Sequence, residues 1–319
     1  MSNIEGACAM SKYPRKIQIE TFLGCNARCT YCTISKWKRE HGAMSAEVFS
    51  RIVEQLVPIR NDIEVVSLYM DGEPLMDREL ENRVQMCKEH GLPHIGFATN
   101  GGLLTEPRAR RLLDAGLDWV SFSFDSLNKE SFEAVRVRLK FNEVLKNIRN
   151  LVELRNAGSY GTKVILRHVN SVDKPEELVE YRNYWSELLR PTDAIQSFNV
   201  HNWGDGSPIS AREARTPCRY VFDNMTILRD GTVPLCCVDY NAQYPFGNVM
   251  ETPLMDIWNG MQWDAARQAH RTGQRAKIGM CGTCNVPEEV DTVERFDSVD
   301  ALKTPEAGSH RTAAAAAVG

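Results

Sequence analysis

Three cysteines stand close together near the start of the chain. In the stretch CNARCTYC, the spacing CxxxCxxC joins Cys25, Cys29 and Cys32. Thiolates at this spacing can hold three irons of one cubane iron–sulfur cluster and leave its fourth iron exchangeable. An open metal position is typical of catalytic rather than structural metal sites. The alternative is a structural zinc site completed by a histidine, for which His41 is the nearest candidate.

A second group of cysteines lies in the last third of the chain: Cys218, Cys236, Cys237, Cys281 and Cys284. Four thiolates close a cluster completely, so the group predicts a site that moves electrons or holds structure. A zinc ribbon is the alternative, because CGTC after a hairpin also fits zinc. Adjacent residues of a strand point to opposite faces, so we expect Cys236 to be the ligand and Cys237 a spare thiol. Such a thiol either returns a hydrogen atom to a substrate radical or fills a small buried space.

The composition narrows the class of protein. With 319 residues, 43% of them apolar and 25% charged, the chain suits one large α/β domain with an appendage, or two small domains. A net charge of −4 gives no electrostatic basis for binding nucleic acid or an anionic membrane. No stretch approaches the ~20 apolar residues of a membrane span, and the first residues lack a secretion signal. We therefore expect a cytoplasmic protein whose ten cysteines form no disulfide framework; those that cluster point to metal binding, whereas Cys8 and Cys87 stand alone.

Alternating strands and helices must position the first cysteine group. Apolar segments predict six strands, at 16–23, 63–70, 94–100, 119–125, 162–169 and 194–200. Helical spacing predicts intervening helices at 45–57, 76–90, 105–115, 129–137, 142–156 and 174–188. This order indicates an α/β fold with a parallel sheet, curled into a barrel or partial barrel. The cysteine loop follows the first strand, at the end where barrel enzymes keep their active sites.

The alternation stops after GDGSP, residues 204–208. Residues 222–240 predict a hairpin of two strands around Asp230-Gly231, and a helix is predicted at 253–270. We therefore expect an N-terminal extension over 1–15, a barrel over 16–205 and a small separate α+β domain over 206–292. The low-complexity end, from residue 293 to 319, predicts a disordered tail.

With Tyr31 as the aromatic residue before its last cysteine, the first group resembles the signature of the radical SAM superfamily. The resemblance implies a partial (β/α)6 barrel with a [4Fe–4S] cluster on Cys25, Cys29 and Cys32. It also implies that the amino and carboxylate groups of S-adenosyl-L-methionine (SAM) chelate the fourth iron. Cleavage of SAM by the reduced cluster then gives a 5′-deoxyadenosyl radical, which abstracts a hydrogen atom from the substrate.

Further segments at predicted strand ends resemble the SAM-binding motifs of that superfamily. The segment DGEPLMD, residues 71–77, is similar to the GGEP motif, with Asp71 in place of the first glycine. The resemblance implies that backbone carbonyls and a carboxylate of Gly72, Glu73 and Pro74 meet the SAM amino group. Ordinary turn chemistry explains each segment alone, but their shared position at strand ends favours a SAM site. The resemblance further implies contacts to SAM from Thr99, Asn100, Ser123, Asp125 and Arg167.

The second cysteine group lies in segments, 217–240, 246–260 and 281–284, that resemble the SPASM/Twitch extension of radical SAM enzymes. The full SPASM version needs further cysteines after Cys284, and this sequence has none there. The resemblance therefore implies the shorter Twitch type, with one auxiliary [4Fe–4S] cluster held by Cys218, Cys236, Cys281 and Cys284.

Twitch-bearing members that act on aminoglycosides and aminocyclitols imply a small, carbohydrate-type substrate and a role in antibiotic biosynthesis. Only about 15 residues precede the first strand, which leaves no room for the recognition domain of peptide-modifying members. We expect an epimerase that uses Cys237 as hydrogen donor, with His201 as a further catalytic candidate. The alternatives are a dehydrogenase that forms a ketone, a peptide maturase and a non-catalytic electron carrier.

Polar residues after the last barrel strand are candidates for substrate binding. Asn202, Trp203, Asp205 and Asp239 suit hydroxyl or amine groups or the role of a base. Carboxylates favour a cationic substrate, and Glu288 and Glu289 add to the candidates. The resemblance also implies a flavodoxin or ferredoxin as the reductant.

Overall fold

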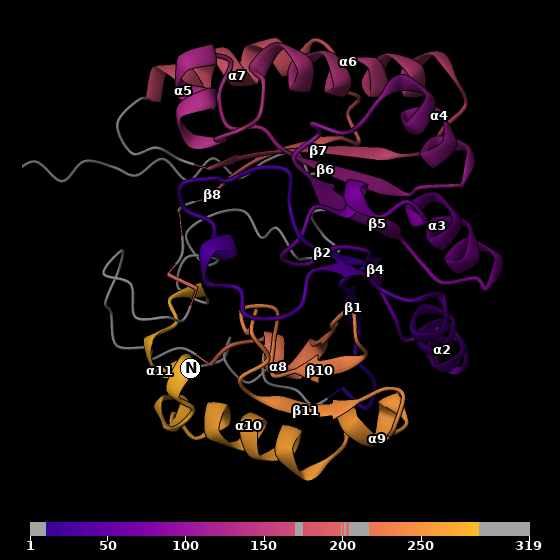
Figure 1. Ribbon diagram of the computed structural model, residues 1–319, viewed down its shortest axis with the longest axis vertical. Coiled ribbons are helices and arrows are strands. Elements are labelled where there is room, and N and C mark those ends of the chain that lie inside the picture. Colours follow the sequence, from indigo (N-terminus) through magenta and orange to yellow (C-terminus); the bar gives the residue numbers. More distant parts are fainter. Residues whose placement is uncertain (1–10, 170–174, 199, 201, 204–216, 287–319) are drawn as a thin grey trace, which may run out of the picture.

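The computed structural model describes residues 11–169, 175–198, 200, 202–203 and 217–286. Its main element is a parallel sheet of seven strands in the order β8-β7-β6-β5-β4-β1-β9 (Figure 1). Six of these strands confirm the strands predicted from the sequence, and their parallel order confirms the partial barrel. The strands are β1 (Lys16–Ile19), β4 (Val65–Ser67), β5 (Ile95–Thr99), β6 (Trp119–Ser123), β7 (Lys163–Val169), β8 (Ala194–Phe198) and β9 (Asn224–Ile227).

Helices alternate with the first six of these strands and cover the outer side of the sheet (Figure 1). Local signals set the ends of these helices. At the start of α2 (Ala46–Leu56), the Ser45 hydroxyl accepts the Val48 amide at 3.1 Å. After α3 (Leu80–Glu89), Gly91 adopts a φ of +71°. Val144, Ile148 and Leu151 recur at helical spacing and are buried against the sheet. The helices are α2 (Ala46–Leu56), η2 (Val57–Ile59), α3 (Leu80–Glu89), α4 (Glu106–Asp114), α5 (Lys129–Val135), α6 (Phe141–Ala157) and α7 (Pro175–Ser186).

The predicted strand 16–23 is two strands with separate partners. β1 belongs to the main sheet, whereas β2 (Phe22–Leu23) pairs antiparallel with β3 (Gly42–Ala43). This short ladder closes the base of the loop that carries the first cysteine group. The loop contains one 3-10 turn, η1 (Thr33–Lys36), directly after Cys32.

The C-terminal region contributes a strand to the barrel sheet. β9 pairs in parallel with β1, with Ile17 opposite Met225 and Ile19 opposite Ile227. The predicted hairpin around Asp230-Gly231 is therefore wrong in its pairing. The turn exists, since the Gly231 amide donates to the Leu228 carbonyl at 2.9 Å, but its two strands lie in different sheets. All four residues of β9 are buried, which suits a strand covered on both faces better than an isolated hairpin. The second strand, β10 (Thr232–Pro234), pairs with β11 (Pro245–Asn248).

The predicted helix 253–270 is interrupted at Gly260, so that its two parts pack at an angle. A side chain at Gly260 would meet the Asp256 carbonyl at 2.9 Å, which identifies a close backbone approach. The rings of Trp258 and Trp263, one from each part, lie 4.6 Å apart in the core. The C-terminal helices are α8 (Tyr220–Asp223), α9 (Leu254–Trp258), α10 (Met261–Arg271), η5 (Arg275–Lys277) and α11 (Gly279–Thr283).

Parts of the predicted organisation lie outside the described residues: positions 1–10 of the N-terminal extension, the boundary at 205–206 and the tail from residue 293. Within the described part, no helix has the length and apolar character that crossing a membrane requires.

Candidate active site and iron–sulfur sites

The first cysteine group lies on the loop at the carboxyl end of β1, where donors from neighbouring strand ends reach its sulfurs. The Cys25 sulfur accepts the Ala27 amide at 3.3 Å and the Asn100 side-chain amide at 3.6 Å. The Cys29 sulfur accepts the Arg136 guanidinium at 3.6 Å. Donors aimed at sulfur stabilise thiolates, and hydrogen bonds to cluster sulfurs help to set cluster potentials. Burial raises the pKa of the Cys25 thiol to about 12, so bound metal must replace its proton.

The turn that resembles GGEP packs backbone to backbone against the cysteine loop. A side chain at Gly72 would collide with the Phe22 carbonyl oxygen, and the Glu73 amide donates to the Gly24 carbonyl at 2.8 Å. Pro74 follows within the same turn and opens the buried 3-10 helix η3 (Pro74–Met76). This contact fixes the turn beside the predicted SAM cluster.

The buried Glu73 carboxylate joins two strand ends. It accepts the Leu75 amide at 3.0 Å, the Thr99 hydroxyl at 2.6 Å and the Asn100 amide at 2.8 Å. Burial raises the pKa of Glu73, and these hydrogen bonds oppose the shift. Protein donors thus already occupy the carboxylate that the sequence analysis assigned to the SAM amino group. Backbone carbonyls are then the better-suited part of that predicted contact.

Arg136 was missed by the sequence analysis and lies at the centre of the site. It pairs with Asp125 through Nε at 2.6 Å and Nη2 at 3.0 Å, and it approaches the Tyr31 ring to 5.2 Å from the centroid. The Tyr31 hydroxyl donates to Asp125 at 3.3 Å. The predicted residues Tyr31 and Asp125 therefore meet beside Cys29, joined by an arginine that follows α5. Nothing local in the sequence distinguishes this arginine from the exposed ones.

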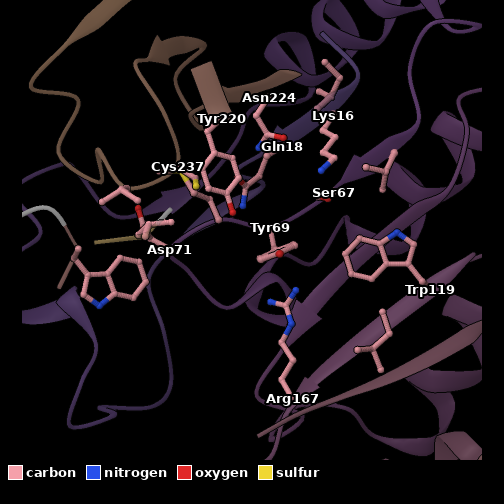
Figure 2. Close-up of a pocket in the computed structure, with 17 residues that line it drawn as sticks. Lys16, Gln18, Ser67, Tyr69, Asp71, Trp119, Arg167, Tyr220, Asn224 and Cys237 are labelled. Atoms are coloured by element: carbon pink, nitrogen blue, oxygen red, sulfur yellow. The ribbon is translucent and has the colours of Figure 1, made fainter. Parts of the chain in front are cut away.

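A cavity opens between the sheet and the C-terminal region, with a volume of about 180 Å³ (Figure 2). Arg167 of β7 lines it, opposite Ser123 in the β6–β7 register. Trp203 lines it too, and its indole donates to the Tyr31 carbonyl at 3.2 Å. The remaining polar lining residues are Lys16, Gln18, Ser67, Tyr69, Asp71, Tyr220, Asn224 and Cys237.

Two substrate-binding candidates are engaged elsewhere. Asn202 donates to the Thr283 carbonyl at 2.5 Å, and Asp239 accepts the amides of Gln243 and Tyr244 at 2.7 and 2.9 Å. Both hold C-terminal loops in place. The candidates His201, Asp205, Glu288 and Glu289 lie outside the described residues.

The second cysteine group divides between two cavities. Cys237 lines the large cavity, whereas Cys236 lines a small one of about 20 Å³ together with Cys218, Cys281 and Cys284. The sequence analysis expected this division from strand alternation, but residues 235–240 form turns rather than a strand. The turn between β10 and β11 separates the two thiols instead. The structure thus brings together the four predicted ligands of the auxiliary cluster.

The chemistry of this small cavity fits an iron–sulfur cluster. Burial, and after it the neighbouring thiols, raise the pKa of Cys218 and Cys236 well above the usual thiol range. The sulfurs are thus close enough to repel one another as thiolates, and cationic irons remove that repulsion. In the described ranges no three or more His, Cys, Asp or Glu side chains are arranged to hold a single metal ion.

The two cavities share part of their lining. Tyr220, Val238 and Val286 contribute to both, so a wall one side chain thick separates the large cavity from the four thiols. His270 and Arg275 also line the small cavity, and the sequence analysis named neither. The Cys218 amide donates to His270 Nδ1 at 3.0 Å.

Comparison with known proteins identifies the class. A family model of the radical SAM superfamily matches residues 19–181, about half of the chain, and a model of the SPASM iron–sulfur cluster-binding domain matches residues 218–285. The chain therefore belongs to the radical SAM superfamily and is a radical SAM enzyme. It uses a [4Fe–4S] cluster together with SAM, and its SPASM region binds auxiliary iron–sulfur clusters.

Individual relatives match over different shares of their length. The SAM-dependent 2-deoxy-scyllo-inosamine dehydrogenase of Niallia circulans is 26% identical over 91% of this chain and 100% of its own. A probable GTP 3′,8-cyclase of Methanococcus maripaludis is 33% identical over 41% of this chain and 43% of its own.

Solved structures share the fold. BtrN in complex with AdoMet and 2-DOIA superimposes with a TM-score of 0.61 at 22% identity, covering 86% of this chain and 94% of BtrN. Streptococcus suis SuiB bound to S-adenosylmethionine gives a TM-score of 0.64 at 17% identity, covering 83% of this chain and 70% of SuiB.

Proposed function

We propose that the protein is a radical SAM dehydrogenase that oxidises a secondary alcohol of an aminocyclitol to a ketone. One observation carries the proposal: the cavity that suits the substrate shares a one-residue wall with the four auxiliary thiols. A dehydrogenase must pass an electron out of its substrate, and this shared wall offers a route to the auxiliary cluster. A relative that is matched along the whole of its own length and along 91% of this chain is a dehydrogenase of 2-deoxy-scyllo-inosamine. The main expectation from the sequence, epimerisation, takes second place for these reasons.

Under this proposal, seven cysteines form two separate metal sites. We assign Cys25, Cys29 and Cys32 to the SAM cluster, and Cys218, Cys236, Cys281 and Cys284 to the auxiliary cluster. When bound, SAM and the clusters supply a hydrogen-abstracting radical and an electron acceptor. Arg136 orients Tyr31 and Asp125 and donates to Cys29, while the turn at Gly72 closes the SAM side. Arg167 and Trp203 bound the substrate cavity, which at about 180 Å³ has room for one six-membered ring.

The overall reaction balances without net reduction. SAM and the alcohol become methionine, 5′-deoxyadenosine, the ketone and one proton. One substrate hydrogen ends in 5′-deoxyadenosine, and the hydroxyl hydrogen leaves as the proton. An electron is needed only to start the cycle, for which a flavodoxin or ferredoxin is the proposed donor.

Epimerisation is the second candidate, because Cys237 lines the same cavity. The thiol would return a hydrogen atom to the opposite face of the substrate. Restoring that thiol takes a second electron and a proton, so each inversion consumes two electrons with one SAM. Under this candidate Cys237→Ala abolishes the inverted alcohol while SAM cleavage persists.

The test uses the anaerobically reconstituted enzyme with SAM, dithionite and 2-deoxy-scyllo-inosamine carrying deuterium at the carbinol carbons. We expect a ketone and 5′-deoxyadenosine in equal amounts, with one deuterium in the 5′-deoxyadenosine. An alcohol of inverted configuration that contains solvent hydrogen would favour the epimerase instead. Release of 5′-deoxyadenosine without any change in the aminocyclitol would overturn both assignments of substrate class.

A further inference from the structure

The cavity contains a buried carboxylate at the position where this sequence departs from the GGEP motif. Asp71 replaces the first glycine, and its side chain is only 2% exposed. It lines the large cavity, where Figure 2 shows it beside Cys237. Its Oδ2 atom is buried and receives no hydrogen bond from the described residues. A buried anionic oxygen without a donor is costly, so a ligand group that satisfies it gains correspondingly.

Among the described residues, the one cation that pairs with Asp71 already binds another carboxylate. Arg39 donates to both oxygens of Glu20 at 2.6 Å, and its Nε donates to the Tyr240 carbonyl at 2.7 Å. The Arg39 guanidinium reaches Asp71 only at 3.6 Å, beyond hydrogen-bond distance. Glu20 is fully buried as well, so its charge requires this arginine.

The charges around Asp71 therefore leave an excess of negative charge. Glu20 and Asp239 oppose its ionisation, Arg39 favours it, and burial raises the pKa of Asp71 well above its usual range. Asp239 satisfies its own oxygens with two backbone amides. One guanidinium thus faces two buried carboxylates and a third acid close by.

The cations of the cavity lie at a distance from this acid. Figure 2 shows Lys16 beyond Tyr69 from Asp71, and Arg167 below Tyr69. Neither contributes to the charges that act on the Asp71 carboxylate. The cavity is therefore polarised, with an anionic end beside Cys237 and a cationic end toward β1 and β7.

We propose that Asp71 is a specificity-determining residue that binds a protonated amine of the substrate at the anionic end of the cavity. The inference rests on the proposed function, because it takes the same cavity as the substrate site, and it narrows the substrate to small ring alcohols that carry an ammonium group. An ammonium supplies both the missing hydrogen bond to Oδ2 and the missing positive charge. A hydroxyl group supplies the hydrogen bond alone.

The test measures equilibrium binding without turnover. The enzyme with its clusters and SAM, but no reductant, is titrated calorimetrically with 2-deoxy-scyllo-inosamine and with the analogue that has a hydroxyl in place of the amine. A second pair of ligands, a 2-amino sugar and its 2-hydroxy parent, tests the same amine preference on a different ring. We expect Asp71→Asn to weaken amine binding about 30-fold or more and to change binding of the hydroxyl analogue less than threefold.

The matched control is Glu40→Gln, which removes one negative charge next to Arg39, on the loop between β2 and β3, at a side chain that is 89% exposed. It should leave the amine preference unchanged. The inference would be overturned if Asp71→Asn weakened the binding of the amine and of the hydroxyl analogue equally. It would also be overturned if the unmodified protein bound neither amine more tightly than its hydroxyl analogue. A protein that prefers the amine yet forms no ketone keeps the role of Asp71 and refutes only the dehydrogenase.

Discussion

The two cysteine groups differ in number and in surroundings, and the difference separates their roles. The group at Cys25, Cys29 and Cys32 has three thiols on a loop, with donors from Asn100 and Arg136 aimed at its sulfurs. The C-terminal group has four thiols around a cavity, and Cys237 faces the substrate cavity instead. Three thiolates leave an iron open for SAM, whereas four close a cluster so that it exchanges only electrons. Under the proposed function, substrate lies between the open site and the closed one.

Removing a thiol from the open group has the largest expected effect. We expect Cys29→Ala to lower formation of 5′-deoxyadenosine about 10³-fold and to halve the iron content of the reconstituted enzyme, because only the closed cluster remains. Iron analysis and chromatography of SAM products measure both. Cys87→Ala is the control, since this buried thiol lies in α3, outside both groups. Unchanged SAM cleavage in Cys29→Ala would contradict the assignment.

Removing a thiol from the closed group should uncouple the reaction rather than stop it. In Cys281→Ala we expect ketone to fall about 100-fold while 5′-deoxyadenosine forms within about tenfold of the parent rate. The reason is that hydrogen abstraction depends on the open group, whereas the substrate electron leaves through the closed one. A variant that loses both products in parallel would show that the two groups are not separate in function.

The buried pair Arg136–Asp125 links the open group to the barrel. Arg136→Met removes the guanidinium that pairs with the buried Asp125 carboxylate, which should cost about 3–5 kcal/mol of folding free energy. It also removes the donor to Cys29, so 5′-deoxyadenosine formation should fall. Urea unfolding measures the first effect and SAM cleavage the second.

Arg155→Met is the matched control, because Arg155 and Asp193 form an equally buried pair away from the cysteines. It should lose similar stability and keep SAM cleavage per folded molecule. If both variants lose SAM cleavage equally, Arg136 acts through stability alone.

The smallest expected effect concerns the stability of the protein. The buried Asp71 carboxylate lowers the free energy of unfolding of the protein when no ligand is bound. Burial and Glu20 raise its folded-state pKa above 3.8, so the folded state holds the proton more tightly than the unfolded state. Stability of the parent then falls as pH rises through the folded-state pKa, whereas Asp71→Asn does not titrate. We expect the variant to be about 1–2 kcal/mol more stable at pH 8 and to gain less as the pH is lowered from 8 toward 3.8, the ordinary pKa of the group, measured by denaturant midpoints. A constant difference across this range would mean that Asp71 is compensated in the folded protein.

Local patterns were sufficient to predict the barrel and the open group. Strands such as 94–100 and helices such as 142–156 carry their own apolar periodicity, and the CxxxCxxC spacing of the open group is itself a local pattern. The pairing of β9 with β1 was missed, because Asp230-Gly231 signals a turn but not the partners of the strands it joins. The division of Cys236 and Cys237 was predicted, although a turn produces it and not a strand.

Residues that act through tertiary contacts had no local signal. Arg136 reaches Cys29 across 107 positions of sequence, and only the folded chain brings it to Tyr31 and Asp125. The substitution at Asp71 was visible in the sequence. The sequence did not show why this substitution matters, because that depends on the hydrogen bonds that Arg39 donates to Glu20.

The central claim is that the closed thiol group takes an electron from substrate held in the neighbouring cavity. The most direct test counts electrons drawn from a titrated one-electron donor for each 5′-deoxyadenosine formed with 2-deoxy-scyllo-inosamine. The account predicts a value near zero after the first turnover, with one ketone for each 5′-deoxyadenosine. A steady consumption of two electrons for each 5′-deoxyadenosine, without ketone, would contradict it.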